Sequence, residues 1–271
     1  GTWAGLVALM GYGIGQAAPL FAFAIIGPRM RRLMPQGHSL TEYAWVRFGK
    51  AMYLFTLGVM VFYMFIFLSA ELTGTALALR LVADIPLGVT AVIVAGGTLI
   101  YTATGGIRAS IFTDRVQFVF ILPLLLIVFI STVIVLGGFG DAFRPISETA
   151  PQLLSLTHGP GIEFGVTLII AILAANMFHQ GFWQRVYSCK DEKALKRGFF
   201  VAGITVVPII CLSGLLGIMA VGLQSSFDPS VALFSLSQEV MTTWGLTIVL
   251  ILALVLVMSS MKMYFSAQDF Q

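Results

Sequence analysis

The chain has 271 residues, of which 58% are hydrophobic and 10% charged, with a net charge of +3 and a mean hydropathy of +0.97. A soluble domain carries about a quarter charged residues, so this composition excludes a soluble protein and predicts an integral membrane protein. The cations fall in breaks between apolar runs and form no continuous basic stripe, which argues against a nucleic-acid partner. Cys189 and Cys211 are too far apart in sequence to indicate a disulfide framework.

One membrane span needs about 20 mainly apolar residues, and seven runs of the chain are candidates. They are residues 2–26, 52–81, 87–103, 116–136, 164–178, 199–223 and 244–261. The chain opens inside the first run and ends abruptly after the last. We therefore expect an all-α bundle of about seven spans, with residues 1–271 forming one transmembrane domain that is truncated at both ends.

The cations alternate between the two sides of these spans. Of the 15 Lys and Arg residues, all but Arg80 and Arg144 fall in the breaks after the odd-numbered spans. Because positive loops stay on the cytoplasmic side, residues 27–51, 104–115 and 179–198 are predicted to be cytoplasmic. The pattern indicates a multi-pass protein of the plasma (inner) membrane, in contact with the lipid bilayer.

Polar groups inside membrane spans are costly and so are default site candidates. The first run contains glycines at alternate positions, in GYGIG (11–15), followed by Gln16. Such glycines disfavour a continuous helix, and a broken span would expose its backbone, with Tyr12 and Gln16, to a ligand. The alternative is close helix packing through small residues.

Two further regions carry polar groups at membrane depth. Glu71 lies within the second span, either beside a substrate path or as a packing hydrogen-bond donor. The segment FHQGFWQR (178–185) follows the fifth span, where His179, Gln180 and Trp183 can supply hydrogen bonds and a stacking face. The alternative for this segment is an interfacial aromatic belt, and we expect interface anchoring for Arg185.

Ser259 and Ser260 interrupt the last apolar run. Two hydroxyls and freed carbonyls are hard oxygen ligands that suit a small hard cation, although serine can also hydrogen-bond to the preceding turn of its own helix. There is no phosphate-binding loop, HExxH, CxxC, histidine cluster or nucleophile–base pair in the sequence. We therefore expect neither an enzyme nor a metal site other than one for a small hard cation.

Several stretches resemble the sodium:solute symporter family, and they occur in the family's order along the chain. The first is GYGIG with the following Gly27-Pro28-Arg29, and the second is Ser39-Leu40-Thr41-Glu42-Tyr43 with Arg47-Phe48-Gly49. The others are Tyr101-Thr102 with Gly105–Ala109 and Thr113–Gln117, Gln184-Arg185 with Lys190-Asp191-Glu192, and Met258-Ser259-Ser260.

Two details resemble the urea-transporting branch of this family. They are the residues 35–39 and the segment 180–185, although His179 stands where that branch has Asp. Ala22 occupies the position where sugar-transporting members carry a substrate-binding Glu, so the resemblance makes a sugar less expected.

The resemblance implies a leucine-transporter-like fold of two inverted repeats, of which this chain would hold an incomplete part. It implies that Ser259, Ser260 and the carbonyl of Leu256 bind sodium, and that Asp114 lines the inner exit of the cation. Asp114 is equally expected to cap the helix that follows it, together with Thr113. Lys262 departs from the family pattern and is expected to extend to the cytoplasmic surface.

We therefore predict a sodium-coupled secondary symporter that moves a small polar solute, such as urea, an amino acid or a carboxylate, by alternating access. Its expected substrate-binding residues are Tyr12, Gln16, Glu71, His179, Gln180 and Trp183. Two alternatives remain open. One is a transporter-like sensory membrane module of a sensor kinase, and the other is a proton-coupled transporter that uses Glu71.

Overall fold

The computed structural model describes residues 4–223 and 229–266, without the side chains of residues 101–114, 117, 229, 252, 255, 256 and 258–266. All regular secondary structure in the described residues is helical. The helices are α1 (Gly5–Leu33), α2 (Leu40–Phe48), α3 (Lys50–Ala83), α4 (Leu87–Val135), α5 (Phe139–Thr149), η1 (Pro151–Leu153), α6 (Gly159–Asn176), α7 (Gln180–Ser188), α8 (Glu192–Leu223), η2 (Pro229–Val231), α9 (Ala232–Val240) and α10 (Thr243–Ser266).

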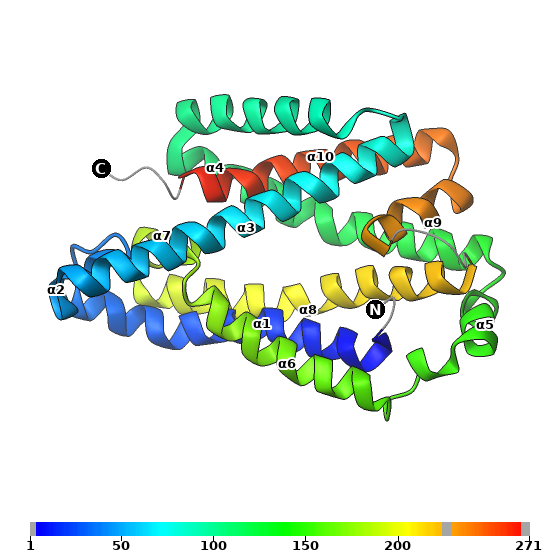
Figure 1. Ribbon diagram of the computed structural model, residues 1–271, viewed down its shortest axis with the longest axis horizontal. Coiled ribbons are helices and arrows are strands. Elements are labelled where there is room, and N and C mark those ends of the chain that lie inside the picture. Colours follow the sequence, from blue (N-terminus) through cyan, green and yellow to red (C-terminus); the bar gives the residue numbers. More distant parts are fainter. Residues whose placement is uncertain (1–3, 224–228, 267–271) are drawn as a thin grey trace.

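The long helices fall into two packed groups (Figure 1). In one group, α1 packs against both α6 and α8, and α1 and α8 run in opposite directions. In the other group, α10 packs against α3 and α4, which also contact each other. Helices α5 and α9 pack against α8, and α7 contacts α1. Helix α7 follows α6 in the chain and lies at the end of the bundle where α1 leads into α2 (Figure 1).

Helix α4 contains two of the predicted spans, 87–103 and 116–136, within one helical assignment of 49 residues. Figure 1 draws α4 as two runs, teal and green, that pass in opposite directions and are joined by a sharp turn. The polar stretch between the two predicted spans lies at this turn, and its side chains are outside the described residues.

Five helical stretches among the described residues are long and apolar enough to cross a membrane. They are Gly5–Leu33, Lys50–Ala83, Phe118–Val135, Gly159–Asn176 and Glu192–Leu223, and Leu87–Ile100 is a shorter apolar stretch. Each overlaps one of the predicted runs. The positions of these runs are therefore reproduced, whereas the inverted-repeat arrangement and the count of seven stay predictions.

The broken-helix interpretation of GYGIG is wrong, because α1 is a continuous helix across these residues. Gly11 faces Gly165 of α6 so closely that an added Cβ would lie 2.4 Å from the Cα of Gly165. The glycines let α1 and α6 approach each other, which is how small residues drive helix association in membranes. The low helix propensity of glycine is outweighed by this interhelical contact.

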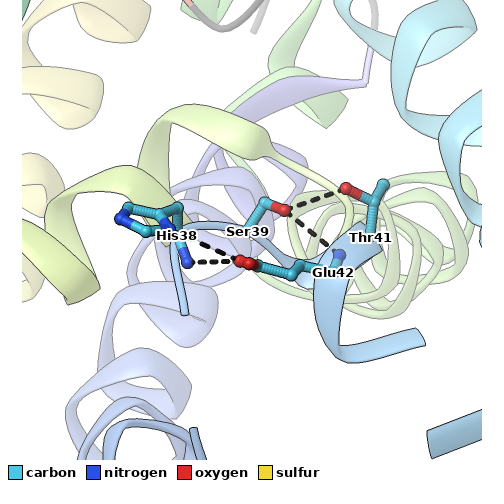
Figure 2. Close-up of polar contacts among 4 residues, drawn as sticks. All are labelled: His38, Ser39, Thr41 and Glu42. Atoms are coloured by element: carbon cyan, nitrogen blue, oxygen red, sulfur yellow. Dashed lines mark hydrogen bonds and ion pairs between the residues drawn. The ribbon is translucent and has the colours of Figure 1, made fainter. Parts of the chain in front are cut away.

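Helix α2 begins with a serine N-cap and a carboxylate contact that together fix the loop after α1 (Figure 2). The backbone N–H of Glu42 donates to Ser39 Oγ at 3.2 Å, and the Glu42 carboxylate accepts from the backbone N–H of His38 at 2.7 Å. The bond to Ser39 satisfies one of the amide groups that the helix start leaves free, and the bond to Glu42 holds the residue before the N-cap. The resemblance element around Glu42 therefore has a structural role in this chain.

The same loop rests against α7. Gly37 is buried, and a Cβ at this position would lie 3.1 Å from the hydroxyl oxygen of Tyr187. Burial raises the pKa of Tyr187, with smaller contributions from Glu42 and Tyr43. The contact ties the first cation-rich loop directly to α7.

Candidate functional site

The helical structure is interrupted between α6, which ends at Asn176, and α7, which begins at Gln180. The last amide groups before the break make tight turns, in which the N–H of His179 donates to the carbonyl of Asn176 at 3.0 Å. The Asn176 side chain donates to the carbonyl of Ile172 at 2.9 Å, and the Trp183 ring N–H donates to the carbonyl of Met177 at 2.7 Å. The Trp183 side chain thus binds a carbonyl at the break, and the Asn176 side chain binds one in the last turn of α6. Irregular backbone in a membrane protein is tolerated only where protein or water surrounds it.

His179 lies at this break inside a set of aromatic rings. Only 3% of its surface is exposed. Its ring stacks on Phe182 with centroids 4.4 Å apart, and the rings of Tyr63 and Phe67 meet it edge-on at 6.0 and 6.4 Å. Helix α3 therefore supplies one wall of the site, and the start of α7 supplies the other.

Two buried oxygen atoms at this place lack a hydrogen-bond partner within the described part of the chain. They are the hydroxyl oxygen of Tyr63 and the side-chain oxygen of Gln180. A buried polar group without a partner costs roughly 1–3 kcal/mol, so such groups are expected where a ligand or an ion supplies the partner. We name the set Tyr63, Phe67, His179, Gln180 and Phe182 the break site.

Glu71 continues the same face of α3. Tyr63, Phe67 and Glu71 are spaced by four residues each, which places them one above another along a helix. Glu71 lines a cavity of about 180 Å³ between α3, α9 and α10 whose other walls, except for Thr75, are apolar. The carboxylate is therefore half-buried in apolar surroundings two helical turns from Tyr63.

The structure brings some predicted substrate residues together and leaves others apart. His179 and Gln180 meet at the break site, and Glu71 lies further along its α3 wall. Tyr12 lies on α1 and is 37% exposed. Gln16 is half-buried on α1, one helical turn after Tyr12.

Trp183 has a structural position. Its ring lies edge-on to Phe23 of α1 at 4.9 Å, and 3% of the residue is exposed. Because its N–H is bonded to the Met177 carbonyl, this side chain holds the break in shape. Its predicted contact with a solute stays a prediction. Arg185 donates to the carbonyl of Gly181 at 3.0 Å, within its own helix.

The predicted sodium ligands cannot be placed. The side chains of Asp114, Leu256, Ser259 and Ser260 lie outside the described residues. In the described part of the chain, no three His, Cys, Asp or Glu side chains lie together as a metal site would need.

Sequence reasoning missed Tyr63, Phe67 and Phe182 as members of the site. The repeat of Tyr63, Phe67 and Glu71 at helical spacing was available as a signal, because it marks one face of a span with aromatic and acidic groups. The pairing of that face with His179 is a long-range contact that spacing alone does not give.

Several apolar helices of spanning length, with buried polar groups at a helix break, define a multi-pass membrane protein. The comparison with protein families is specific, since the model of the sodium:solute symporter family matches residues 3–268. The chain belongs to this family, whose members are transporters and not enzymes.

The chain is similar to several transporters. It is 31% identical over 261 residues to the spermidine transporter of Candida albicans, covering 93% of this chain and 48% of that protein. It is 23% identical over 222 residues to a probable urea active transporter of Schizosaccharomyces pombe, covering 75% of this chain and 33% of that protein. A sodium/pantothenate symporter of Haemophilus influenzae is 31% identical over 119 residues, 42% of this chain and 24% of that protein. The chain thus spans half or less of these relatives.

Proposed function

We propose that residues 1–271 belong to one transmembrane domain of a sodium-coupled secondary symporter, which moves a small nitrogen-rich solute by alternating access. Membership of the family supports sodium coupling in general. The class of solute rests on the break site, where the buried oxygens of Tyr63 and Gln180 can accept hydrogen bonds from N–H groups.

The surroundings of these oxygens favour urea or an amine over the other solutes considered. Aromatic faces attract cationic and polar N–H groups, and three such rings surround His179. Glu71 along the same face of α3 would attract a cationic amine and repel an anion, so a carboxylate solute is disfavoured. The names of the spermidine and urea transporters among the relatives agree with this choice.

The central experiment measures uptake of labelled urea and spermidine by cells that express the protein. We expect Tyr63→Phe and Gln180→Leu to raise the KM about fivefold to tenfold, the loss of roughly one hydrogen bond. Tyr53→Phe is the matched control, because Tyr53 lies on the same helix and packs against Trp45. Unchanged KM values in both break-site variants, with normal amounts at the cell surface, would refute the assignment.

Sodium coupling is tested by replacing external sodium with choline. The proposal that Ser259, Ser260, the Leu256 carbonyl and Asp114 handle sodium predicts that Ser259→Ala with Ser260→Ala abolishes the dependence of uptake on sodium. Asp114→Asn should slow transport and leave solute binding intact. Sodium-dependent uptake that persists in the double serine variant contradicts this site.

Orientation in the plasma membrane is part of the same proposal. The cation-rich segments 27–51, 104–115 and 179–198 are assigned to the cytoplasm by the positive-inside rule. Figure 1 supports a common side for two of them, since the end of α1, α2 and α7 lie at one end of the bundle. Cysteine labelling at Gln36 from outside intact cells should fail and should succeed after permeabilisation.

A proton-coupled transporter is the second candidate, because Glu71 lies in an apolar cavity where a carboxyl group can exchange a proton. This candidate predicts uptake that is insensitive to sodium but lost when the pH gradient is collapsed. Glu71→Gln should then abolish accumulation while leaving exchange of solute across the membrane.

A further inference from the structure

A groove lies between the end of α1 and the start of α8, away from the break site. Its volume is about 580 Å³, and it combines charged and apolar walls. The lining residues are Ala24, Ile25, Pro28, Arg29, Arg32, Lys196, Arg197 and Phe200. The groove forms because α1 and α8 are antiparallel neighbours, so the last turns of one helix lie beside the first turns of the other.

The charged wall carries an excess of positive charge. Arg32 is paired with Glu192 through two hydrogen bonds of 2.6 Å. Among the residues whose side chains the structure describes, no salt bridge joins the other three cations, Arg29, Lys196 and Arg197, to an acid, although Glu192 also attracts Lys196. All three side chains are exposed. Like charges so close together repel one another unless an anion binds between them.

The remaining wall of the groove is apolar and open. Ile25 is 59% exposed and Phe200 is 54% exposed. Phe200 packs against Phe21 with ring centroids 5.4 Å apart, and Val201 and Ile204 extend the exposed apolar surface of α8 away from the cations. The groove thus has positive charge at one end and an apolar surface that continues from it. A phospholipid has the complementary layout, because its anionic headgroup is followed by acyl chains.

We propose that this groove binds an anionic phospholipid of the leaflet that contacts the cation-rich end of the bundle. The headgroup phosphate lies among Arg29, Lys196 and Arg197, and an acyl chain lies along Ile25 and Phe200. Basic pockets between membrane helices recognise anionic headgroups in this way. A free anion would gain nothing from the apolar wall, and a zwitterionic lipid would gain less than an anionic one from the three cations.

The test uses native mass spectrometry of the purified protein with dioleoylphosphatidylglycerol or dioleoylphosphatidylcholine as the probe. Each Lys or Arg near the membrane surface contributes about fivefold in affinity for an anionic lipid. We therefore expect Lys196→Gln with Arg197→Gln to weaken phosphatidylglycerol binding by about 25-fold. The control is Lys190→Gln with Lys193→Gln, which removes the same charge from the same segment but does not line the groove.

Further arms distinguish the lipid from other anions and separate binding from folding. Phe200→Ala should weaken phosphatidylglycerol binding although every cation is kept, whereas Arg197→Lys should retain binding in a protein of unchanged size-exclusion profile. Equal weakening in the two double variants would show diffuse surface charge and overturn the proposal. Displacement of the lipid by excess inorganic phosphate, or equal binding of phosphatidylcholine, would overturn it as well.

Discussion

The two groups of long helices are held together by different means. In the most apolar stretch of α1, 44% of the residues are buried within the protein, against 17% in α6, 22% in α8, 17% in α3 and 11% in the second run of α4. The close packing of the first group is therefore centred on α1. Glycines explain the difference. Gly11, Gly203 and Gly214 touch neighbouring helices, whereas nothing lies within 4 Å of a Cβ added at Gly58 or Gly74 on α3.

This difference shows what drives helix association in a membrane protein. Lipid tails are as apolar as leucine, so burial of apolar surface gives little drive for helices to associate in a bilayer, and close van der Waals contact must supply it. The α1–α6–α8 group obtains that contact through small residues. The α3–α4–α10 group leaves broad apolar faces for lipid or for other protein to cover.

The largest effect is expected from adding one methyl group at the glycine contact. Gly11→Ala places a Cβ 2.4 Å from the Gly165 Cα, a clash with backbone that cannot rotate away. Overpacking of this kind costs about 1–3 kcal/mol or more. Gly58→Ala makes the same change in open space and should be neutral or stabilising, because alanine favours helix by about 1 kcal/mol. Thermal unfolding in detergent checks the pair, and equal melting temperatures would remove the distinction between the two groups.

A smaller effect is expected at two tryptophans that belong to different groups. Trp183→Phe removes the N–H that donates to the Met177 carbonyl and leaves that oxygen without its partner. The expected loss of stability is about 1–3 kcal/mol. Trp244 is 81% exposed on α10, so Trp244→Phe should change stability little. A Trp183→Phe variant as stable as the natural protein would show that the break does not depend on this bond.

The loop that joins the two groups gives the next test. Ser39→Ala removes the side-chain acceptor at the start of α2, which costs about 1 kcal/mol. Ser39→Asp keeps an acceptor and should retain stability. Ser188→Ala is the control, since the Ser188 hydroxyl donates only within its own helix. The order of the three melting temperatures decides the prediction, and loss of stability in the aspartate variant would contradict it.

The smallest effect is expected at the Arg32–Glu192 pair. These side chains are 68% and 37% exposed, and exposed ion pairs are weakened by solvent and salt. Arg32→Gln, Glu192→Gln and the double variant should therefore have the same melting temperature at physiological salt. A coupling that survives high salt would mean that the α1–α8 contact depends on charge as well as on glycine.

Much of the fold follows from the apolar runs, because a span has a narrow range of lengths and its polar flanks are visible in the sequence. The breaks near Asp84, Gly137 and Met177 fall where the runs end. The prediction for GYGIG was wrong because the helix propensity of glycine describes an isolated helix and not its contacts with a neighbour. Gly165 faces Gly11 only in three dimensions, and no local pattern indicates that contact.

The candidate site was predictable in part. His179 and Gln180 stood out as polar groups at the end of a span, and both are buried at the break between α6 and α7. The wall formed by Tyr63 and Phe67 lies more than a hundred positions earlier in the chain, so it required the packing of α3. Trp183 was also visible in the sequence, but its role was not. The sequence does not distinguish a ring that contacts a solute from one whose N–H binds a carbonyl at the end of a helix.

The contact between Gly37 and Tyr187 has a mechanical consequence. Tyr187 lies two turns from Gln180 on the same short helix, and its hydroxyl presses on the loop that leads into α2. Any tilt of α7 that accompanies solute binding is therefore transmitted to this loop at the protein surface. A spin label on the exposed Gln36 beside it should report occupancy of the break site without changing the residues that we propose hold the solute.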